Sequence, residues 1–227
     1  MHYRKPTPRL PRICACGSAY SLDHSQVCLK GGFIHMRRDE PKMLWAKKAK
    51  LVFNDVEVEP WLEPLSGEAL ESKQAKVGDD VRSDVRIRGF WGNRQQAFFE
   101  FRVLYPFASS YLSAEPEALY TRFAKIRKAE YAERINRVDS GSFTPMIMSS
   151  SGGMGPEMSA AVKHMAMLIA ERRGETYSQV AGFLRCEFSF AMMRSALICL
   201  RGSRSVKPRE LTLEDTPVDV VMQELRL

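Results

Sequence analysis

The chain of 227 residues is 44% apolar and 10% aromatic and carries a formal net charge of +7. This composition excludes an intrinsically disordered chain, and the length suffices for one domain with a sizeable core plus an appendage. The positive surplus lies in the first quarter of the chain, since residues 1–50 hold eleven Lys and Arg against three Asp and Glu, and residues 51–227 hold 23 against 24. A basic segment of this kind is typical of proteins that bind a phosphate backbone, with a merely solvated basic tail as the alternative.

The N-terminal arm, residues 1–12, is basic and rich in proline, and no apolar run follows it. It therefore has the features of neither a signal peptide nor a membrane anchor, and we expect an intracellular protein with no membrane partner. In that compartment cysteines usually bind metals, react or lie buried instead of forming disulfides. Cys186 and Cys199 fall in an apolar helical pattern and are interpreted as small buried side chains.

The stretch CACGSAYSLDHSQVCLKGG, residues 14–32, places Cys14, Cys16, His24 and Cys28 within fifteen residues. Three thiolates and one imidazole are the ligand set of a structural zinc site, which can fold a segment too short to bury its own core. Only one residue separates the first two cysteines where two to four are usual, so chance clustering or a redox role stays open. The spacing predicts a zinc knuckle that precedes the main domain.

The middle of the chain predicts one helix and three strands. Residues 39–53 form a helical pattern with Pro41 in the first turn, where a missing amide hydrogen costs nothing. VEVEP, residues 56–60, alternates as a short strand does, and the polar residues 62–80 are interpreted as a loop. Two further alternating runs, at 82–90 and 96–106, flank the turn WGNRQ and predict a pair of strands.

The second half predicts mostly helices. Helical patterns cover about 115–138, then 157–173 and 177–202, and FTPMIMSS at 143–150 is interpreted as a further strand. The last helix carries Arg185, Glu187 and Arg194 and is too charged to span a bilayer. The order of elements predicts a mixed α/β (α+β) domain, in which helices flank a small mixed sheet.

Two strands carry acidic residues that could act together. Side chains alternate across a strand, so Asp84 shares a face with Arg86 and Arg88, and Glu100 shares a face with Arg102. If the strands pair with these faces aligned, Asp84 and Glu100 converge with Arg102 beside them. Two close carboxylates repel unless a cation lies between them, which is the arrangement of a Mg²⁺ site on a phosphate substrate. The alternative is an exposed sheet face that pairs its own charges across strands and does no catalysis.

A metal at this position would polarise a phosphodiester and lower the pKa of an attacking water. Arg102 could stabilise charge developing on the phosphoryl oxygens. It could not be the general base, because a guanidinium does not lose its proton in proteins.

The motifs together resemble a known family. Over roughly Cys14 to Ser205, the chain is similar to the C-terminal region of reverse-transcriptase polyproteins from non-long-terminal-repeat retrotransposons, where a Cys-Cys-His-Cys knuckle precedes a restriction-like endonuclease of the PD-(D/E)XK type. The matching pieces are CACG, DHSQVC, the GGF after it, EPWLEPLSGE, RSDVRIRGFWG, AFFEFRV, FTPMIMSSSGGMG and LRGSRS. The most specific part of the resemblance is the knuckle with AFFEFRV downstream of it.

The resemblance implies a restriction-endonuclease-like core of a helix, three strands, a helix and a strand. It implies a basic arm and knuckle over 1–36, an endonuclease domain over 37–205 and a tail over 206–227. The acidic ligands of Mg²⁺ or Mn²⁺ fall on Asp84 and Glu100, the usual lysine position falls on Arg102, and a supporting helix glutamate falls on Glu40. In that family the enzyme nicks chromosomal DNA and the exposed 3′ hydroxyl primes reverse transcription, so a nuclear location is expected.

The predicted binding partner is DNA, with RNA as an alternative and a reverse transcriptase chain as a further partner. Candidate contacts to the nucleic acid are Arg37, Arg38, Lys42, Lys47 and Lys48, with Arg86 and Arg88 nearer the scissile phosphate. Lys47 and Lys48 could equally be the solvated face of a helix. Two other functions stay open: a catalytically inactive relative that only binds nucleic acid, and a module that docks on a polymerase partner.

Overall fold

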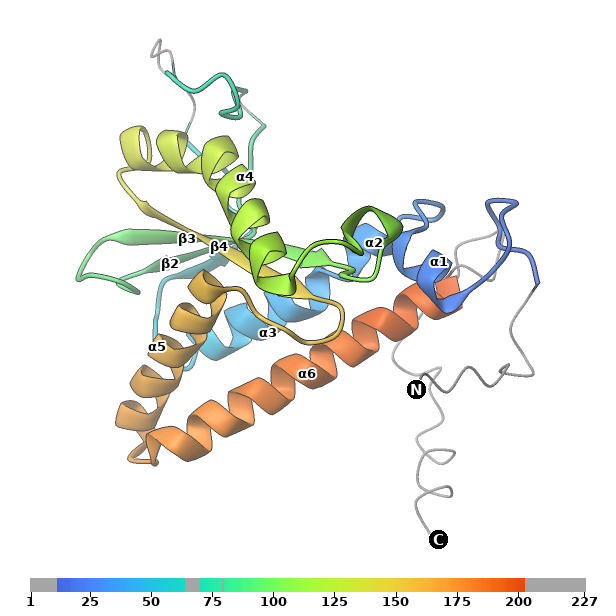
Figure 1. The fold of residues 1–227 in the computed structure, drawn as a ribbon. Coiled ribbons are helices and arrows are strands. Elements are labelled where there is room, and N and C mark those ends of the chain that lie inside the picture. Colours follow the sequence, from blue (N-terminus) through green and yellow to red (C-terminus); the bar gives the residue numbers. More distant parts are fainter. Residues whose placement is uncertain (1–11, 64–69, 79, 203–227) are drawn as a thin grey trace, which may run out of the picture.

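A four-stranded sheet forms the centre of the fold (Figure 1). The computed structural model describes residues 12–63, 70–78 and 80–202, so the predicted tail 206–227 and most of the N-terminal arm lie outside the described residues. The strands are β1 (Val56–Val58), β2 (Val85–Arg88), β3 (Gln96–Leu104) and β4 (Ser142–Ser149), and they lie side by side in this order. β2 is antiparallel to both of its neighbours, β1 and β3, while β4 runs parallel to β3. The expected mixed α/β class with a small mixed sheet is confirmed.

Helices cover both faces of the sheet (Figure 1). α4 (Pro116–Arg137) connects the parallel strands β3 and β4 and packs on one face, as a parallel connection requires. The other face is covered by α3 (Asp39–Ala49), α5 (Pro156–Arg173) and α6 (Tyr177–Gly202). β3 is consequently buried on both sides, which its alternating sequence did not indicate.

The core is divided by the sheet. On the side of α3, α5 and α6, Trp45 packs against Phe99 with ring centroids 5.1 Å apart, and Phe188 of α6 joins the same cluster. On the side of α4, Phe123 packs with Leu104 of β3 near the end of that strand. Each buried aromatic side chain of this size contributes about 2–3 kcal/mol relative to an exposed position.

Two short helices at the N-terminal end are docked onto the end of α6. They are α1 (Leu22–Val27) and α2 (Phe33–Met36), and Figure 1 shows α1 beside the last turns of α6. The hydroxyl of Tyr20 donates to the carbonyl of Leu200 at 2.9 Å, and Gln26 Nε2 donates to the carbonyl of Ala196 at 3.2 Å. The N-terminal segment is therefore packed on the main body of the fold.

Some element boundaries differ from the sequence-based expectation. The helix expected over 39–53 ends at Ala49, the strand expected over 82–90 covers only Val85–Arg88, and the short helices α1, α2 and η1 (Ser109–Tyr111) were not predicted. Cys186 is exposed on α6, so its interpretation as a buried side chain was wrong, whereas Cys199 is buried. None of the described helices, α6 included, combines the length and apolar character that crossing a membrane would need.

Candidate functional site

The side chains of Cys14, Cys16, His24 and Cys28 converge. Their donor atoms all lie within 4.8 Å of one another, with 3.8 Å between the sulfurs of Cys14 and Cys28 and 3.2 Å between Cys16 Sγ and His24 Nε2. A tetrahedral zinc with Zn–S bonds of about 2.3 Å requires sulfur–sulfur distances of about 3.8 Å. The four donors therefore fit a metal ion such as zinc.

The local backbone explains how so short a stretch forms this cluster. Gly17 adopts a positive φ of 91° and its amide donates to the carbonyl of Cys14, which closes a tight turn between the first two cysteines. Ser21 caps α1 by accepting the amide of His24, and Cys28 ends the same helix. The helix spacing of four residues brings His24 and Cys28 to one side.

A second cluster lies where β2 begins beside β3. Val85 pairs with Phe99, so the residues just beyond this pair, Asp84 and Glu100, face each other, and each is only 3% exposed. The side chain of Asp84 accepts a hydrogen bond from the amide of Phe101 at 2.7 Å. The two predicted carboxylates line one cavity of about 300 Å³ on the α4 side of the sheet; its other charged or phenolic lining residues are Arg38, Glu59, Lys76, Arg82, Arg127 and Tyr131.

Burial strongly alters the ionisation of this carboxylate pair. Loss of solvent, assisted by the charge of Asp84, raises the pKa of Glu100 to about 7. Loss of solvent also raises the pKa of Asp84, although the guanidinium of Arg38, 3.9 Å from Asp84 Oδ1, opposes the rise. Two facing carboxylates in a desolvated cavity favour a shared proton or a bound cation. A hard divalent ion with oxygen ligands, such as Mg²⁺, suits this donor set.

Glu59 adds a third carboxylate that sequence reasoning missed. It directly follows β1, its amide donates to the carbonyl of Asp84 at 2.8 Å, and Lys42 Nζ holds its carboxylate at 2.7 Å. That contact with Lys42 lowers the pKa of Glu59. Its φ of 54° lies in the left-handed region, which costs a non-glycine residue roughly 1–2 kcal/mol. The feature that could have identified Glu59 is the register between β1 and β2. Val58 pairs with Val85, so the next residue beyond each of them brings Glu59 beside Asp84.

Arg102 and Glu40 do not join the carboxylate cavity. The guanidinium of Arg102 lies over the ring of Phe123, 4.2 Å from its centroid, and lines a neighbouring cavity instead. Glu40 pairs with Arg194 of α6 at 3.2 Å, on the other side of α3. Besides Arg38 and Arg82, the cations that line the cavity are Lys76, whose Nζ donates to the hydroxyl of Tyr131 at 2.7 Å, and Arg127. Neither was singled out from the sequence, because both come from segments far from β2 and β3.

Three of the predicted nucleic-acid contacts are buried inside the protein. Arg37 donates to the carbonyls of Gln26 and Val103 at 2.9 and 2.8 Å, so it ties the N-terminal helices to β3. Lys42 is occupied by Asp39 and Glu59, and Lys48 pairs with Glu187 of α6 at 2.6 Å. The expectation that Arg37, Lys42 and Lys48 present a binding face was wrong. Arg37 lies at the end of α2 and points into the contact between α1 and β3. Lys42 and Lys48 lie on α3, where contacts with Glu59 next to β1 and with Glu187 of α6 bury positions that a helix on the surface would expose.

The remaining predicted contacts are accessible to different degrees. Arg86 is paired with Asp55 and Glu57 at 3.0 and 2.9 Å, and Arg88 lies 3.8 Å from Asp55. This pairing is the cross-strand arrangement considered as the alternative to a binding role. Arg38 lines the carboxylate cavity, and Lys47 is exposed on α3.

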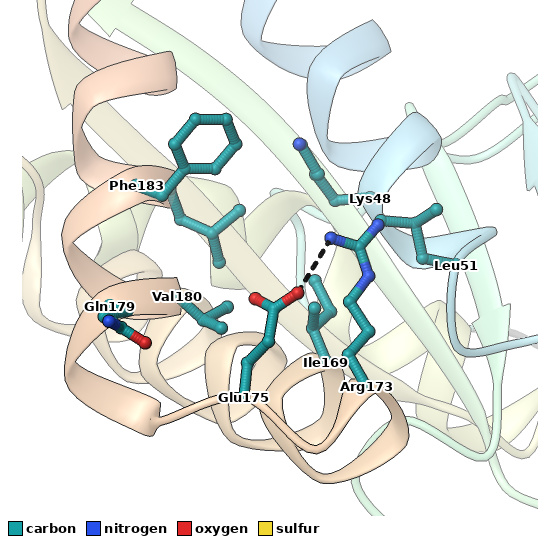
Figure 2. A pocket seen from close by; sticks show the side chains of 9 residues that line it. Lys48, Leu51, Ile169, Arg173, Glu175, Gln179, Val180 and Phe183 are labelled. Carbon is teal, nitrogen blue, oxygen red and sulfur yellow. Dashed lines mark ion pairs between the residues drawn. The ribbon is translucent and has the colours of Figure 1, made fainter.

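A separate cavity of about 400 Å³ lies between α3, α5 and α6 (Figure 2). Its apolar lining belongs to the core on the opposite side of the sheet from Asp84 and Glu100. Ile169, Val180 and Leu184 form its apolar wall, and an ion pair of 3.7 Å between Arg173 and Glu175 lies at its edge (Figure 2). Among the described residues that line it, Glu175 is the only carboxylate, and none is a cysteine or histidine. We assign it no chemistry.

Comparisons with known proteins leave the family open. No protein-family model matches the chain, and a search of curated proteins finds no match.

Proposed function

We propose that the chain is a metal-dependent DNA endonuclease domain with a restriction-endonuclease-like core and a zinc knuckle. The observation that carries the proposal is the buried pair Asp84 and Glu100, which face each other from adjacent strands and share one cavity with Glu59. The order α3, β1, β2, β3, α4, β4 supports it, because the resembled nuclease family also has a helix, three strands, a helix and a strand.

The three carboxylates of the cavity and two of its cations have roles in this proposal. Asp84 and Glu100, with Glu59 beside them, would hold Mg²⁺ or Mn²⁺, and the metal would polarise the phosphodiester and activate water. Lys76 and Arg127 would stabilise negative charge on the phosphoryl oxygens, as positively charged groups in a desolvated site do. We therefore transfer to Lys76 and Arg127 the role that the resemblance gave to Arg102.

The Cys14, Cys16, His24 and Cys28 cluster would hold a structural zinc ion. A closed site with four protein ligands leaves no open position for a substrate. Its role in the proposal is to fix α1 and α2 against α6 and, through Arg37, against β3.

A catalytically inactive relative that only binds nucleic acid is the second candidate. It is favoured by Arg38, whose guanidinium 3.9 Å from Asp84 is a fixed cation that could neutralise the carboxylate without a metal. The two candidates predict the same binding of DNA but opposite results in a cleavage assay.

The first test is nicking of supercoiled plasmid by zinc-loaded protein with Mg²⁺ or Mn²⁺. The intact chain should nick, and Asp84→Ala and Glu100→Ala should each lose at least about a hundredfold in rate, on the scale of removing one key catalytic group. Glu171→Ala changes an exposed acid of α5 and serves as the matched control, with an unchanged rate. Equal nicking by all four proteins would indicate a contaminating nuclease, and silence of the intact chain with retained DNA binding would support the inactive relative.

The resemblance also suggests the biological setting. In this proposal the protein nicks chromosomal DNA in the nucleus for a retrotransposon and acts together with a reverse transcriptase chain. RNA is a further nucleic-acid partner in the proposal. The chemical consequence is testable with the protein alone. If the nick serves to prime synthesis, it must leave a 3′ hydroxyl that a DNA polymerase extends without prior treatment. A nick that is extended only after a phosphatase has removed a 3′ phosphate would contradict the priming role.

A further inference from the structure

The cavity that Arg102 lines has a volume of about 520 Å³ and borders the carboxylate cavity of Asp84 and Glu100. It lies between the N-terminal helices, the end of β3 and the segment that contains η1, and Arg38 and Arg127 line both cavities. Its size is that of ordinary ligand pockets. The basic residues in its walls are His35, Arg37, Arg38, Arg102 and Arg127, and none of the described residues that line it is Asp or Glu.

The arginines of this second cavity differ in how fully they are used. Both terminal nitrogens of Arg37 donate to backbone carbonyls, those of Gln26 and Val103, so only its buried Nε has no partner among the described residues. Arg102 lies over the ring of Phe123 and forms no ion pair within the described part of the chain. Arg127 pairs with Glu130 through one nitrogen, while its buried Nε has no hydrogen-bond partner among the described residues. Arg102 and Arg127 therefore retain donors for a further group.

The charges of Arg102 and Arg127 also oppose each other. Loss of solvent lowers the pKa of Arg102, and the nearby positive charge of Arg127 lowers it further. A guanidinium remains charged despite such a shift, so the repulsion persists in the free protein. An anion between the two would remove the repulsion and satisfy the free donors, and the planar guanidinium fork suits phosphate oxygens in particular.

We propose that this arginine cavity binds a second phosphate of the DNA strand whose scissile phosphate lies at Asp84 and Glu100. The inference rests on the proposed function for the position of the scissile phosphate, and it changes the role of Arg102 from the catalytic one implied by the resemblance to substrate binding. Arg38 and Arg127, which line both cavities, make the path between the two phosphates continuous. The exposed residues Ser109 and Ser110 stand in the wall of the cavity.

Binding without cleavage tests this site separately from the nuclease activity. The probe is a fluorescein-labelled duplex oligonucleotide, titrated by anisotropy with zinc-loaded protein in the absence of Mg²⁺ and Mn²⁺ at several salt concentrations. Arg102→Gln and Arg127→Gln should each weaken binding about tenfold, as loss of a charged hydrogen bond does, and reduce the slope of log K against log salt by about one. Arg122→Gln removes the same charge from an exposed position of α4 outside the cavity and should change both quantities little.

A further variant guards against misfolding of the arginine substitutions. Ser110→Glu adds a negative charge to the wall of the cavity at an exposed position, leaves every arginine in place and should also weaken binding about tenfold. If Arg102→Gln, Arg127→Gln and Ser110→Glu all bind like Arg122→Gln, the phosphate site is overturned. If these three lose affinity while the intact chain never nicks, the phosphate site stands and the proposed nuclease function fails.

Discussion

At the scale of single residues, Glu100 is the side chain whose chemistry depends most on its surroundings. Its folded-state pKa of about 7 lies above the ordinary value for a glutamate because burial and Asp84 both disfavour the charged form. Between roughly pH 4.5 and 7 the folded state therefore binds more protons than the unfolded state, and stability is lost as the pH rises through this window. The carboxylate that would hold a metal thus weakens the metal-free fold.

Replacing this carboxyl with an amide should remove that cost. We predict that Glu100→Gln raises the free energy of unfolding at pH 8 by about 1–3 kcal/mol, and that the gain shrinks toward zero near pH 5, where the wild-type carboxyl is protonated in the folded state. Urea denaturation of both proteins at the two pH values, without divalent metal, measures the difference. Glu171→Gln, at an exposed position of α5, is the control. A gain of the same size at pH 5 and pH 8 would show that ionisation of Glu100 is not its cause.

At the scale of elements, the N-terminal helices and the sheet are joined by one buried side chain. Arg37 is 3% exposed and bridges the carbonyl of Gln26, in α1, to that of Val103, in β3. Hydrogen bonds from a charged donor to buried carbonyls are worth more than neutral ones, and a buried carbonyl that loses its donor costs about 1–3 kcal/mol. The position of α1 beside β3 therefore depends on Arg37.

Removing this bridge should destabilise the protein and loosen α1. We predict that Arg37→Leu, which keeps an aliphatic side chain but loses both donors, lowers the free energy of unfolding by about 2–4 kcal/mol. Lys47→Leu, at an exposed position of α3, should change it by no more than about 0.5 kcal/mol. Denaturant unfolding compares the two variants, and equal effects would contradict the bridging role.

The elements also show how far the sequence could predict the site. Alternation in the second and third strands indicated that Asp84 and Glu100 converge if the strands pair with their polar faces aligned, and the register of Val85 with Phe99 provides this alignment. Lys76 and Arg127 reach the same cavity only through the packing of the 70–78 segment and α4, which no local pattern encodes. The burial of Lys42 and Lys48 was likewise not predictable from local pattern, since Lys42 is covered through Glu59 next to β1 and Lys48 through Glu187 of α6, which lies far away in the chain.

At the scale of the whole molecule, the cysteine and histidine cluster connects the two ends of the described chain. The residues around it contact the last turns of α6 through Tyr20 and Gln26, and Cys199 of α6 contacts the carbonyl of Phe33. The same N-terminal segment supplies Gln26, Ile34 and His35 to the wall of the arginine cavity. A metal in the cluster would therefore shape a binding surface that its own ligands do not touch.

Loss of the metal should therefore unfold the N-terminal segment, residues 12–36, and leave the sheet and α4 folded. We predict that the purified chain contains about one zinc per molecule, and that chelation or Cys16→Ser removes it and abolishes hydrogen-exchange protection over residues 12–36 while β3 and α4 stay protected. Affinity for duplex DNA should fall with the loss of this wall, before the sheet unfolds. Cys186→Ser alters an exposed cysteine of α6 outside the cluster and should retain both zinc and protection. Equal zinc content in the two serine variants would refute the assignment of Cys16 as a ligand. Loss of hydrogen-exchange protection in β3 together with residues 12–36 would show that the cluster supports the entire core and not only the N-terminal segment.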